Sequence, residues 1–152
     1  MNLTNMQPRN FEICARAFIQ IDGKILLCQA KGKGHFFLPG GHVEFGETAL
    51  EALTRELDEE LGVSINNADF MGTVENIYRE GENYHHEINL VFRVELETQN
   101  HTSKEDQISF TLFTREEFKK IAVLPLALKE NIIQWFDDGK MFFAAQKDSP
   151  ID

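Results

Sequence analysis

Hydrophobic and polar residues alternate near the middle of the chain, in the run YHHEINLVFRVEL at residues 84–96. A period of two is typical of a β-strand with one face toward the core and the other toward a polar environment. The apolar face would carry Ile88, Leu90, Phe92, Val94 and Leu96, and the polar face Glu87, Asn89, Arg93 and Glu95.

Other apolar runs predict further strands. Segments 11–20 and 24–30 read as two strands, and the Asp22-Gly23 pair between them is typical of a two-residue hairpin turn. More strands are expected at 35–41, where Pro39 breaks the run, at 69–80 and at 108–113. The strands therefore occupy much of the chain on both sides of one acidic segment.

That acidic segment predicts a helix over residues 48–61, with Gly62 as its stop. Four leucines fall on one helical face and are expected to form its core stripe: Leu50, Leu53, Leu57 and Leu61. Segments 115–122 and 126–136 also have helical patterns. This order of elements indicates an α+β sandwich with a mixed sheet, built as one domain over residues 1–152 with a frayed tail at about 147–152.

Composition narrows the classes of function. A length of 152 residues suits one hydrophobic core, and the formal net charge of -10 argues against stable binding to nucleic acid or to an anionic membrane. The chain has no signal-peptide pattern and no apolar run of membrane-spanning length. Cys14 and Cys28 lie in apolar runs, so we expect buried thiols and a cytoplasmic protein rather than a disulfide framework.

The carboxylates of the acidic segment share a second helical face. Glu56, Glu59 and Glu60 stand at i, i+3 and i+4, and Ala49 and Ala52 precede them on that face. Neighbouring like charges repel, and a hard cation such as Mg²⁺ would remove the repulsion. We expect the alanines to leave room for a bulky group. Taken alone, the pattern also fits a solvated acidic surface.

The spacing of the whole segment decides between these readings. Residues 41–63 resemble the Nudix box, the signature of hydrolases that act on a nucleoside diphosphate linked to another group. The fixed positions of that box are filled by Gly41, Glu47, Arg55, Glu56, Leu57, Glu59, Glu60, Gly62 and Val63. Residues 38–41, Leu-Pro-Gly-Gly, look like the usual lead-in. The resemblance implies a Nudix-type α/β/α sandwich with a mixed central sheet.

The resemblance also implies roles for the box residues. Glu56, Glu59 and Glu60 would hold one or more Mg²⁺ or Mn²⁺ ions, with Glu47 and the Gly41 backbone as further metal contacts. Glu56, Glu59 and Arg55 would be catalytic, Arg55 by orienting a carboxylate with its planar fork. Gly40 would bring backbone close to the substrate phosphates. The implied reaction is a metal-assisted attack of water on phosphorus.

Residues outside the box supply further candidates. Glu105, in the polar loop after the 84–96 strand, looks similar to a loop carboxylate of MutT-type enzymes and is the candidate fourth ligand or base. Glu87 is the alternative, because one face of its strand points toward the cleft. Phe37 and Tyr78 are candidates for stacking on a base, against the alternative of a core role.

The sequence therefore predicts an enzyme, a Nudix pyrophosphohydrolase that cleaves a nucleoside triphosphate or another nucleoside diphosphate derivative. Its partner would be a small nucleotide, with no membrane or stable nucleic-acid binding, and a homodimer is left open. The alternative is a Nudix-fold sensor that binds a nucleotide without cleaving it. Such proteins usually lack some box acids, and this box lacks none.

Overall fold

The computed structural model describes residues 9–98 and 101–148. Its strands are β1 (Phe11–Ile21), β2 (Lys24–Ala30), β3 (Gly40–His42), β4 (Ile65–Glu80), β5 (Asn83–Leu96), β6 (Ile108–Phe113) and β7 (Phe142–Lys147). Its helices are α1 (Ala49–Leu61), α2 (Arg115–Lys120) and α3 (Leu126–Asp138).

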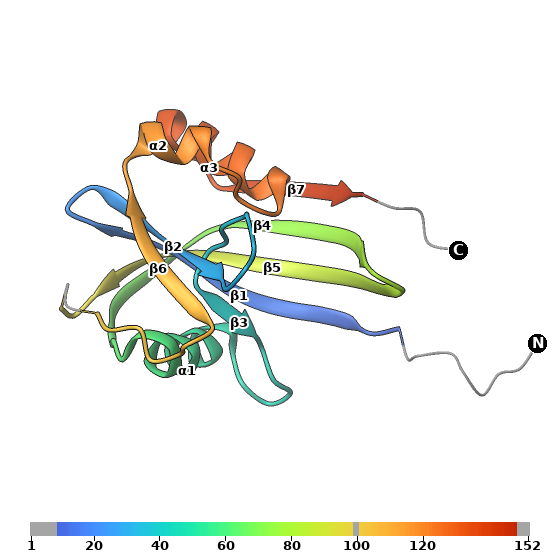
Figure 1. The fold of residues 1–152 in the computed structure, drawn as a ribbon, viewed down its shortest axis with the longest axis horizontal. Helices are drawn as coiled ribbons and strands as arrows, with labels where there is room; N and C mark the ends of the chain where they lie inside the picture. The colour runs from blue at the N-terminus through green and yellow to red at the C-terminus, as the bar shows by residue number, and fades with distance from the viewer. Residues whose placement is uncertain (1–8, 99–100, 149–152) are drawn as a thin grey trace, which may run out of the picture.

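The strands form a mixed sheet in the order β6-β2-β1-β5-β4-β7, with β3 paired to β1. The β1–β5 and β4–β7 pairs are parallel, and the remaining pairs are antiparallel. Helix α1 covers one face of the sheet, and α2 and α3 cover the other (Figure 1). The expected α/β/α sandwich with a mixed central sheet is confirmed.

Strand β1 supplies side chains to both hydrophobic layers. Ala15, Ala17 and Ile19 pack with the leucines of α1, whereas Phe18 points to the opposite face and packs with residues of α2 and α3. This alternation follows from the period of two along a strand. A central strand covered on both faces has little exposed surface, and this is why β1 reads as a nearly continuous apolar run.

The β1–β2 hairpin confirms the predicted turn. Asp22 and Gly23 both have positive φ, 50° and 77°, as the two central residues of a type I′ turn require. The strand expected over 35–41 is wrong in its position, because β3 begins only at Gly40, after the proline. Phe36 and Phe37 instead make isolated bridges to Val123 and Cys28.

Helix α1 ends at the predicted residue, Leu61, and begins at Ala49, one residue later than predicted, with Thr48 as its N-cap. The Thr48 side chain accepts a hydrogen bond from the Glu51 N–H, the Glu51 carboxylate accepts one from the Thr48 N–H, and Gly62 closes the helix with φ 66°. The predicted core stripe is wrong at one position: Leu50 is 44% exposed. Ala52 is fully buried in its place, so it leaves no room beside the acids.

Three other expectations fail where tertiary contacts decide. Asn89, placed on a polar outer face of β5, is only 1% exposed, because the second helical layer covers that face. Strand β7 was not predicted, although it pairs with β4. It runs through Lys147, and the Asp148 N–H donates to the Ile77 carbonyl, so the frayed tail expected from 147 begins too early. Residues 149–152 lie outside the described residues.

The two cysteines are buried and unpaired, as expected. Burial raises the pKa of the Cys14 thiol to about 11 and raises the pKa of the Cys28 thiol as well. Within the described parts of the chain, no helix is long and apolar enough to cross a membrane.

Burial along α1 predicts different costs for two leucine truncations on the same helix. Leu57→Ala removes a fully buried side chain and should lower the free energy of unfolding by about 2–5 kcal/mol. Leu50→Ala, the matched control, should cost less than about 1 kcal/mol, because its side chain is already half exposed. Urea denaturation of both variants measures the difference, and equal costs would contradict this packing.

Candidate active site

The packing of α1 sets the direction of its charged side chains. Because Leu53, Leu57 and Leu61 face the sheet, Glu56 and Glu59 project from the side of the helix toward β3. The side chain of Glu56 is 19% exposed and that of Glu59 is 54% exposed. The two carboxylates therefore belong to one cluster but differ in their contact with solvent.

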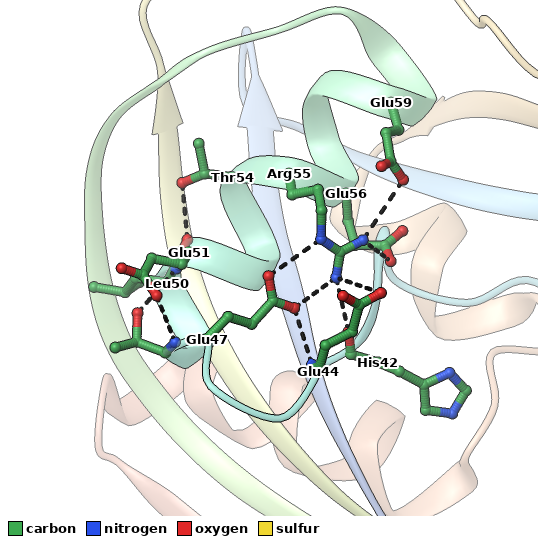
Figure 2. A network of polar contacts seen from close by, with 10 residues as sticks. His42, Glu44, Glu47, Leu50, Glu51, Thr54, Arg55, Glu56 and Glu59 are labelled. Atoms are coloured by element: carbon green, nitrogen blue, oxygen red, sulfur yellow. Dashed lines mark hydrogen bonds and ion pairs between the residues drawn. The ribbon is translucent and has the colours of Figure 1, made fainter.

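Arg55 stands at the centre of this cluster (Figure 2). Its Nη2 and Nε donate to the two oxygens of Glu47 at 2.6 and 3.2 Å, and its Nη1 donates to Glu56 Oε1 at 2.9 Å. A looser ion pair joins Arg55 Nη1 to Glu59 Oε2 at 3.6 Å. Nη2 also donates to the carbonyl of His42, at the end of β3. The planar guanidinium thus ties the loop before α1, the helix and β3 together.

The ion pairs shift the acid–base equilibria of the partners. Hydrogen bonds from Arg55, and then from the Glu44 N–H, hold the pKa of the Glu47 carboxyl below its usual range. The same contacts with Glu47 and Glu56 raise the pKa of Arg55. Both groups are therefore charged at neutral pH.

The two glycines of β3 bring backbone close to the acids. A Cβ on Gly41 would lie 2.6 Å from the Glu56 carboxylate, and a Cβ on Gly40 would overlap the Ala15 carbonyl oxygen. Gly40 also has φ 134°, a conformation that side chains disfavour. Glycine at both positions is what lets β3 pass between β1 and the acidic side of α1.

Glu60 has a different environment from the other box acids. It is 6% exposed, and its Oε2 has no hydrogen-bond partner among the described residues. Burial raises the pKa of its carboxyl to about 8, and the charges of Glu56 and Glu105 act in the same direction. The positive charge of Arg16 and the Gly40 N–H oppose this shift without cancelling it. A buried carboxylate among like charges is unstable without a cation.

The polar loop places Glu105 near Glu60, although 45 positions separate them in the sequence. The loop docks on the C-terminal end of α1. The Lys104 N–H donates to the Glu60 carbonyl at 2.9 Å, and the Thr102 N–H donates to the Leu61 carbonyl at 3.2 Å. Glu105 is exposed, and Glu87 is not among the groups that perturb Glu60. The loop therefore holds Glu105 at the end of α1 near Glu60, whereas Glu87 lies on β5 and accepts a hydrogen bond from Tyr78.

Glu87 instead lines a pocket of about 540 Å³ on the α3 side of the sheet, together with Phe37 and Tyr78. Three further residues, Arg16, Asn76 and Asn89, line it and were missed from the sequence. Asn89 belongs to the alternating polar face of β5, a pattern that also fits an exposed face, and Arg16 is a single charge in an apolar run. Neither pattern indicates a pocket. Only the position of α3 shows that this face encloses a pocket.

Comparison with known proteins agrees with this geometry. A family model described as the NUDIX domain matches residues 12–136. This chain belongs to the NUDIX family. The ADP-ribose pyrophosphatase of Methanocaldococcus jannaschii is 48% identical over 54 residues, which cover 34% of this chain and 32% of that protein. The low-salt glycan biosynthesis protein Agl8 of Haloferax volcanii is 39% identical over 72 residues, 45% of this chain and 46% of that protein.

The match thus spans about a third to a half of the length of these curated relatives. Solved structures extend the likeness to nearly the whole chain. The MutT protein of Bacillus halodurans has a TM-score of 0.72 at 17% identity, covering 90% of this chain and 91% of its own. The MutT protein of Methanosarcina mazei also has a TM-score of 0.72, at 22% identity, covering 89% and 99%. At these identities the likeness shows the Nudix fold.

The donors of this Nudix box fit a hard divalent cation. They are carboxylate oxygens, the ligands that Mg²⁺ prefers, and they include the unpartnered Oε2 of Glu60. Glycine at position 41 allows the Glu56 carboxylate to lie directly against the β3 backbone. In the described chain no three acids, histidines or cysteines already converge on one metal position. Arg55 holds Glu47 and Glu56, so binding an ion requires side-chain rearrangement around Glu60.

The shifted pKa of Glu60 predicts a pH-dependent stability in the absence of metal. Its folded pKa of about 8 exceeds the ordinary value of 4.5, so the folded protein binds the extra proton between these pH values. Stability should therefore fall as pH rises through this window. Glu60→Gln should remove this component and raise the free energy of unfolding near pH 9 by about 1–3 kcal/mol.

Urea denaturation in EDTA at about pH 5 and about pH 9 measures the effect. The variant and the wild type should agree at the lower pH, where the side chain at position 60 is neutral in both folded proteins. Asp58→Asn, an exposed acid on the same helix, is the matched control and should keep the wild-type difference. A Glu60→Gln curve parallel to that of the wild type would contradict the buried, unpartnered carboxylate.

Proposed function

We propose that this chain hydrolyses the pyrophosphate bond of a nucleoside triphosphate or another nucleoside diphosphate derivative, using Mg²⁺ or Mn²⁺. The observation that carries the proposal is Glu60: a buried carboxylate with an unpartnered oxygen, beside Glu56 and Glu105. A protein gains no stability from such a group unless a cation joins it. An anionic, metal-bound substrate accounts for both the acids and the adjoining pocket.

Glu56, Glu59 and Glu60 are the proposed metal ligands, and Glu47 and the Gly41 backbone are further contacts. The bound cation supplies neutralisation of phosphate charge and activation of water. Glu47 accepts two hydrogen bonds from Arg55 and Glu56 accepts one. A carboxylate has about four acceptor sites, so both acids can also contact an ion while they stay bonded to Arg55.

Arg55 positions these carboxylates by its hydrogen bonds to Glu47, Glu56 and His42. Gly40 and Gly41 let the β3 backbone lie directly against β1 and against the Glu56 carboxylate, which keeps backbone groups at the proposed phosphate position. The pocket on the α3 side adjoins this region, because Arg16 and Leu38 line it and Arg16 also acts on the charge of Glu60. A nucleotide can therefore place its phosphates at the acids and its nucleoside in the pocket.

Glu105 is the proposed general base or additional ligand. Its loop is anchored to α1 by backbone hydrogen bonds from Thr102 and Lys104, which leaves the Glu105 side chain free to turn toward Glu60. A hydrogen bond from the Ser103 hydroxyl to the Glu105 carbonyl steadies the loop on the other side. A carboxylate held near the reacting water without deep burial suits proton abstraction at neutral pH.

The reaction is tested by incubating the protein with nucleoside triphosphates, sugar nucleotides and dinucleoside polyphosphates, with Mg²⁺ or Mn²⁺, and identifying products by mass. Glu56→Gln should lower turnover by about 100-fold or more, since it removes charge from the metal face. Asp58→Asn is the matched control and should retain turnover. Mg²⁺ should also raise the melting temperature of the wild type more than that of Glu56→Gln.

Two results would contradict the proposal. One is the absence of hydrolysis of every nucleotide class with either metal, which would favour a nucleotide-binding sensor if the melting temperature still rises with ligand. The other is a Glu56→Gln variant with the turnover of the wild type.

The proposed role of Glu105 predicts a separable effect. Glu105→Gln should lower kcat by about 10²–10⁴-fold and remove the acidic limb of the pH–rate profile, because the group that must be ionised is gone. Its melting-temperature response to Mg²⁺ should stay close to that of the wild type if Glu105 is the base, and weaken if it is a ligand. Asp106→Asn, the exposed neighbour, is the control. Full activity of the Glu105→Gln variant would show that Glu105 is neither the general base nor a required metal ligand.

A further inference from the structure

The floor of the pocket is polar, although it lies on the face of the sheet that is apolar elsewhere. Val74 in β4 and Val91 in β5 point to this face and are fully buried with residues of α2 and α3. Farther along the same strands this face carries polar side chains, Asn76 and Tyr78 from β4 and Glu87 from β5, and these line the pocket. The change from apolar to polar residues marks where the helical layer gives way to the pocket.

Asn76 and Glu87 are direct cross-strand partners in the β4–β5 ladder. Side chains at such positions have Cβ atoms about 4.5–5.5 Å apart, so the two groups stand side by side on the floor. Asn76 is 7% exposed, and its Oδ1 has no hydrogen-bond partner among the described residues. A buried, unpaired acceptor of this kind needs an explanation, and a ligand donor is one.

The Glu87 carboxylate is held in place but not saturated. Tyr78 donates its hydroxyl to Glu87 Oε1 at 2.9 Å, and Asn89 Nδ2 approaches Oε2 at 3.5 Å while also donating to the Val74 carbonyl. A carboxylate has about four acceptor sites, so sites remain on both oxygens. Because the Tyr78 proton is used on Glu87, the phenol oxygen presents only its lone pairs to the pocket. This part of the floor therefore offers hydrogen-bond acceptors.

We infer that Glu87 and Asn76 form a specificity subsite for a substrate group with two adjacent hydrogen-bond donors. This inference rests on the proposed function, in that the pocket receives the nucleoside part of the substrate. Two parts of a nucleotide have that chemistry: the N1–H and N2 amino group of guanine, and the vicinal hydroxyls of ribose. The pairing edges of uracil and adenine mix donors with acceptors, and an acceptor placed against the carboxylate is repelled.

The opposite side of the pocket supports this orientation of the substrate. The Arg16 guanidinium lines the pocket and donates from Nη1 to the Leu38 carbonyl at 3.3 Å. Its charge also acts on Glu60. Arg16 thus places one positive charge toward the proposed phosphate position, whereas the acceptors Asn76 and Glu87 come from β4 and β5. The donor-bearing group is therefore directed to Asn76 and Glu87, away from the box acids.

The test compares nucleotide pairs that differ by one donor. GTP and ITP differ only in the N2 amino group, and GTP and 2′-deoxy-GTP differ only in one ribose hydroxyl. We expect the wild type to prefer GTP in kcat/KM by about 10-fold or more in one of the two pairs, because a hydrogen bond to a charged acceptor is lost. The first pair reports a guanine edge and the second a ribose diol.

Glu87→Gln should reduce that preference to about 3-fold or less, because the amide offers one acceptor atom in place of two and carries no charge. Glu80→Gln is the matched control: this exposed acid lies at the rim of the same pocket and should keep the wild-type preference. Thermal unfolding of both variants checks that the fold is retained, and Glu87→Ala provides a second loss of the carboxylate. A purely structural role would lower kcat/KM for both members of each pair equally.

Binding of GMP, IMP and 2′-deoxy-GMP by calorimetry gives the same comparison without turnover. Hydrolysis or binding with no preference in either pair, or a preference unchanged in Glu87→Gln, would overturn the subsite while leaving the proposed reaction in place. A preference in binding without any hydrolysis would support the subsite and reject the proposed reaction. Failure of all three monophosphates and both triphosphate pairs to bind would overturn the subsite as well.

Discussion

The site depends on how closely α1 packs against β1. Leu53, Leu57 and Leu61 are buried on the small side chains of Ala15 and Ala17, and this contact fixes the rotation of the helix. Once that rotation is fixed, the positions of the three box acids follow, because residues at i, i+3 and i+4 share one side of a helix. Glu56, Glu59 and Glu60 therefore all lie on the side of α1 toward β3. The hydrophobic effect, roughly 25 cal/mol per Å² of apolar surface buried, thus stabilises a helix whose other face carries mutually repelling charges.

The repulsion is only partly relieved within the protein. Arg55 neutralises Glu47 and Glu56 through short hydrogen bonds at the mouth of the cluster, whereas Glu60 lies behind them with an unpartnered oxygen. The raised pKa of Glu60 reflects this repulsion and burial, because the folded protein disfavours the charged carboxylate relative to the neutral carboxyl. A charged Glu60 therefore lowers the stability of the folded protein, and a cation bound beside it would offset this loss. Such an exchange between stability and function is expected of the proposed metal site.

On the opposite face of the sheet, one part of each of β4 and β5 packs under the helices and another part lines the pocket. The residues under the helices are Val74 in β4 and Val91 in β5. Along the same face, Asn76 lies two positions from Val74, and Glu87 lies four positions from Val91. The strands are continuous through this change, so the rigid sheet that forms the core also positions the polar floor of the pocket. Arg16 in β1 lines this pocket, and its charge also acts on Glu60. One sheet thereby supports both halves of the proposed substrate.

Local sequence determined the elements whose causes are local. Thr48 and Gly62 bound α1 through their own caps, Asp22-Gly23 makes the hairpin turn, and the box spacing gathers its acids on one helix, so the family and the acid cluster could be predicted. Tertiary structure decided the rest, because burial depends on what covers a face. It exposed Leu50, desolvated Glu60, brought Glu105 to Glu60 across 45 positions and enclosed Asn76 beside Glu87. None of these follows from periodicity, which gives the direction of a side chain but not its neighbours.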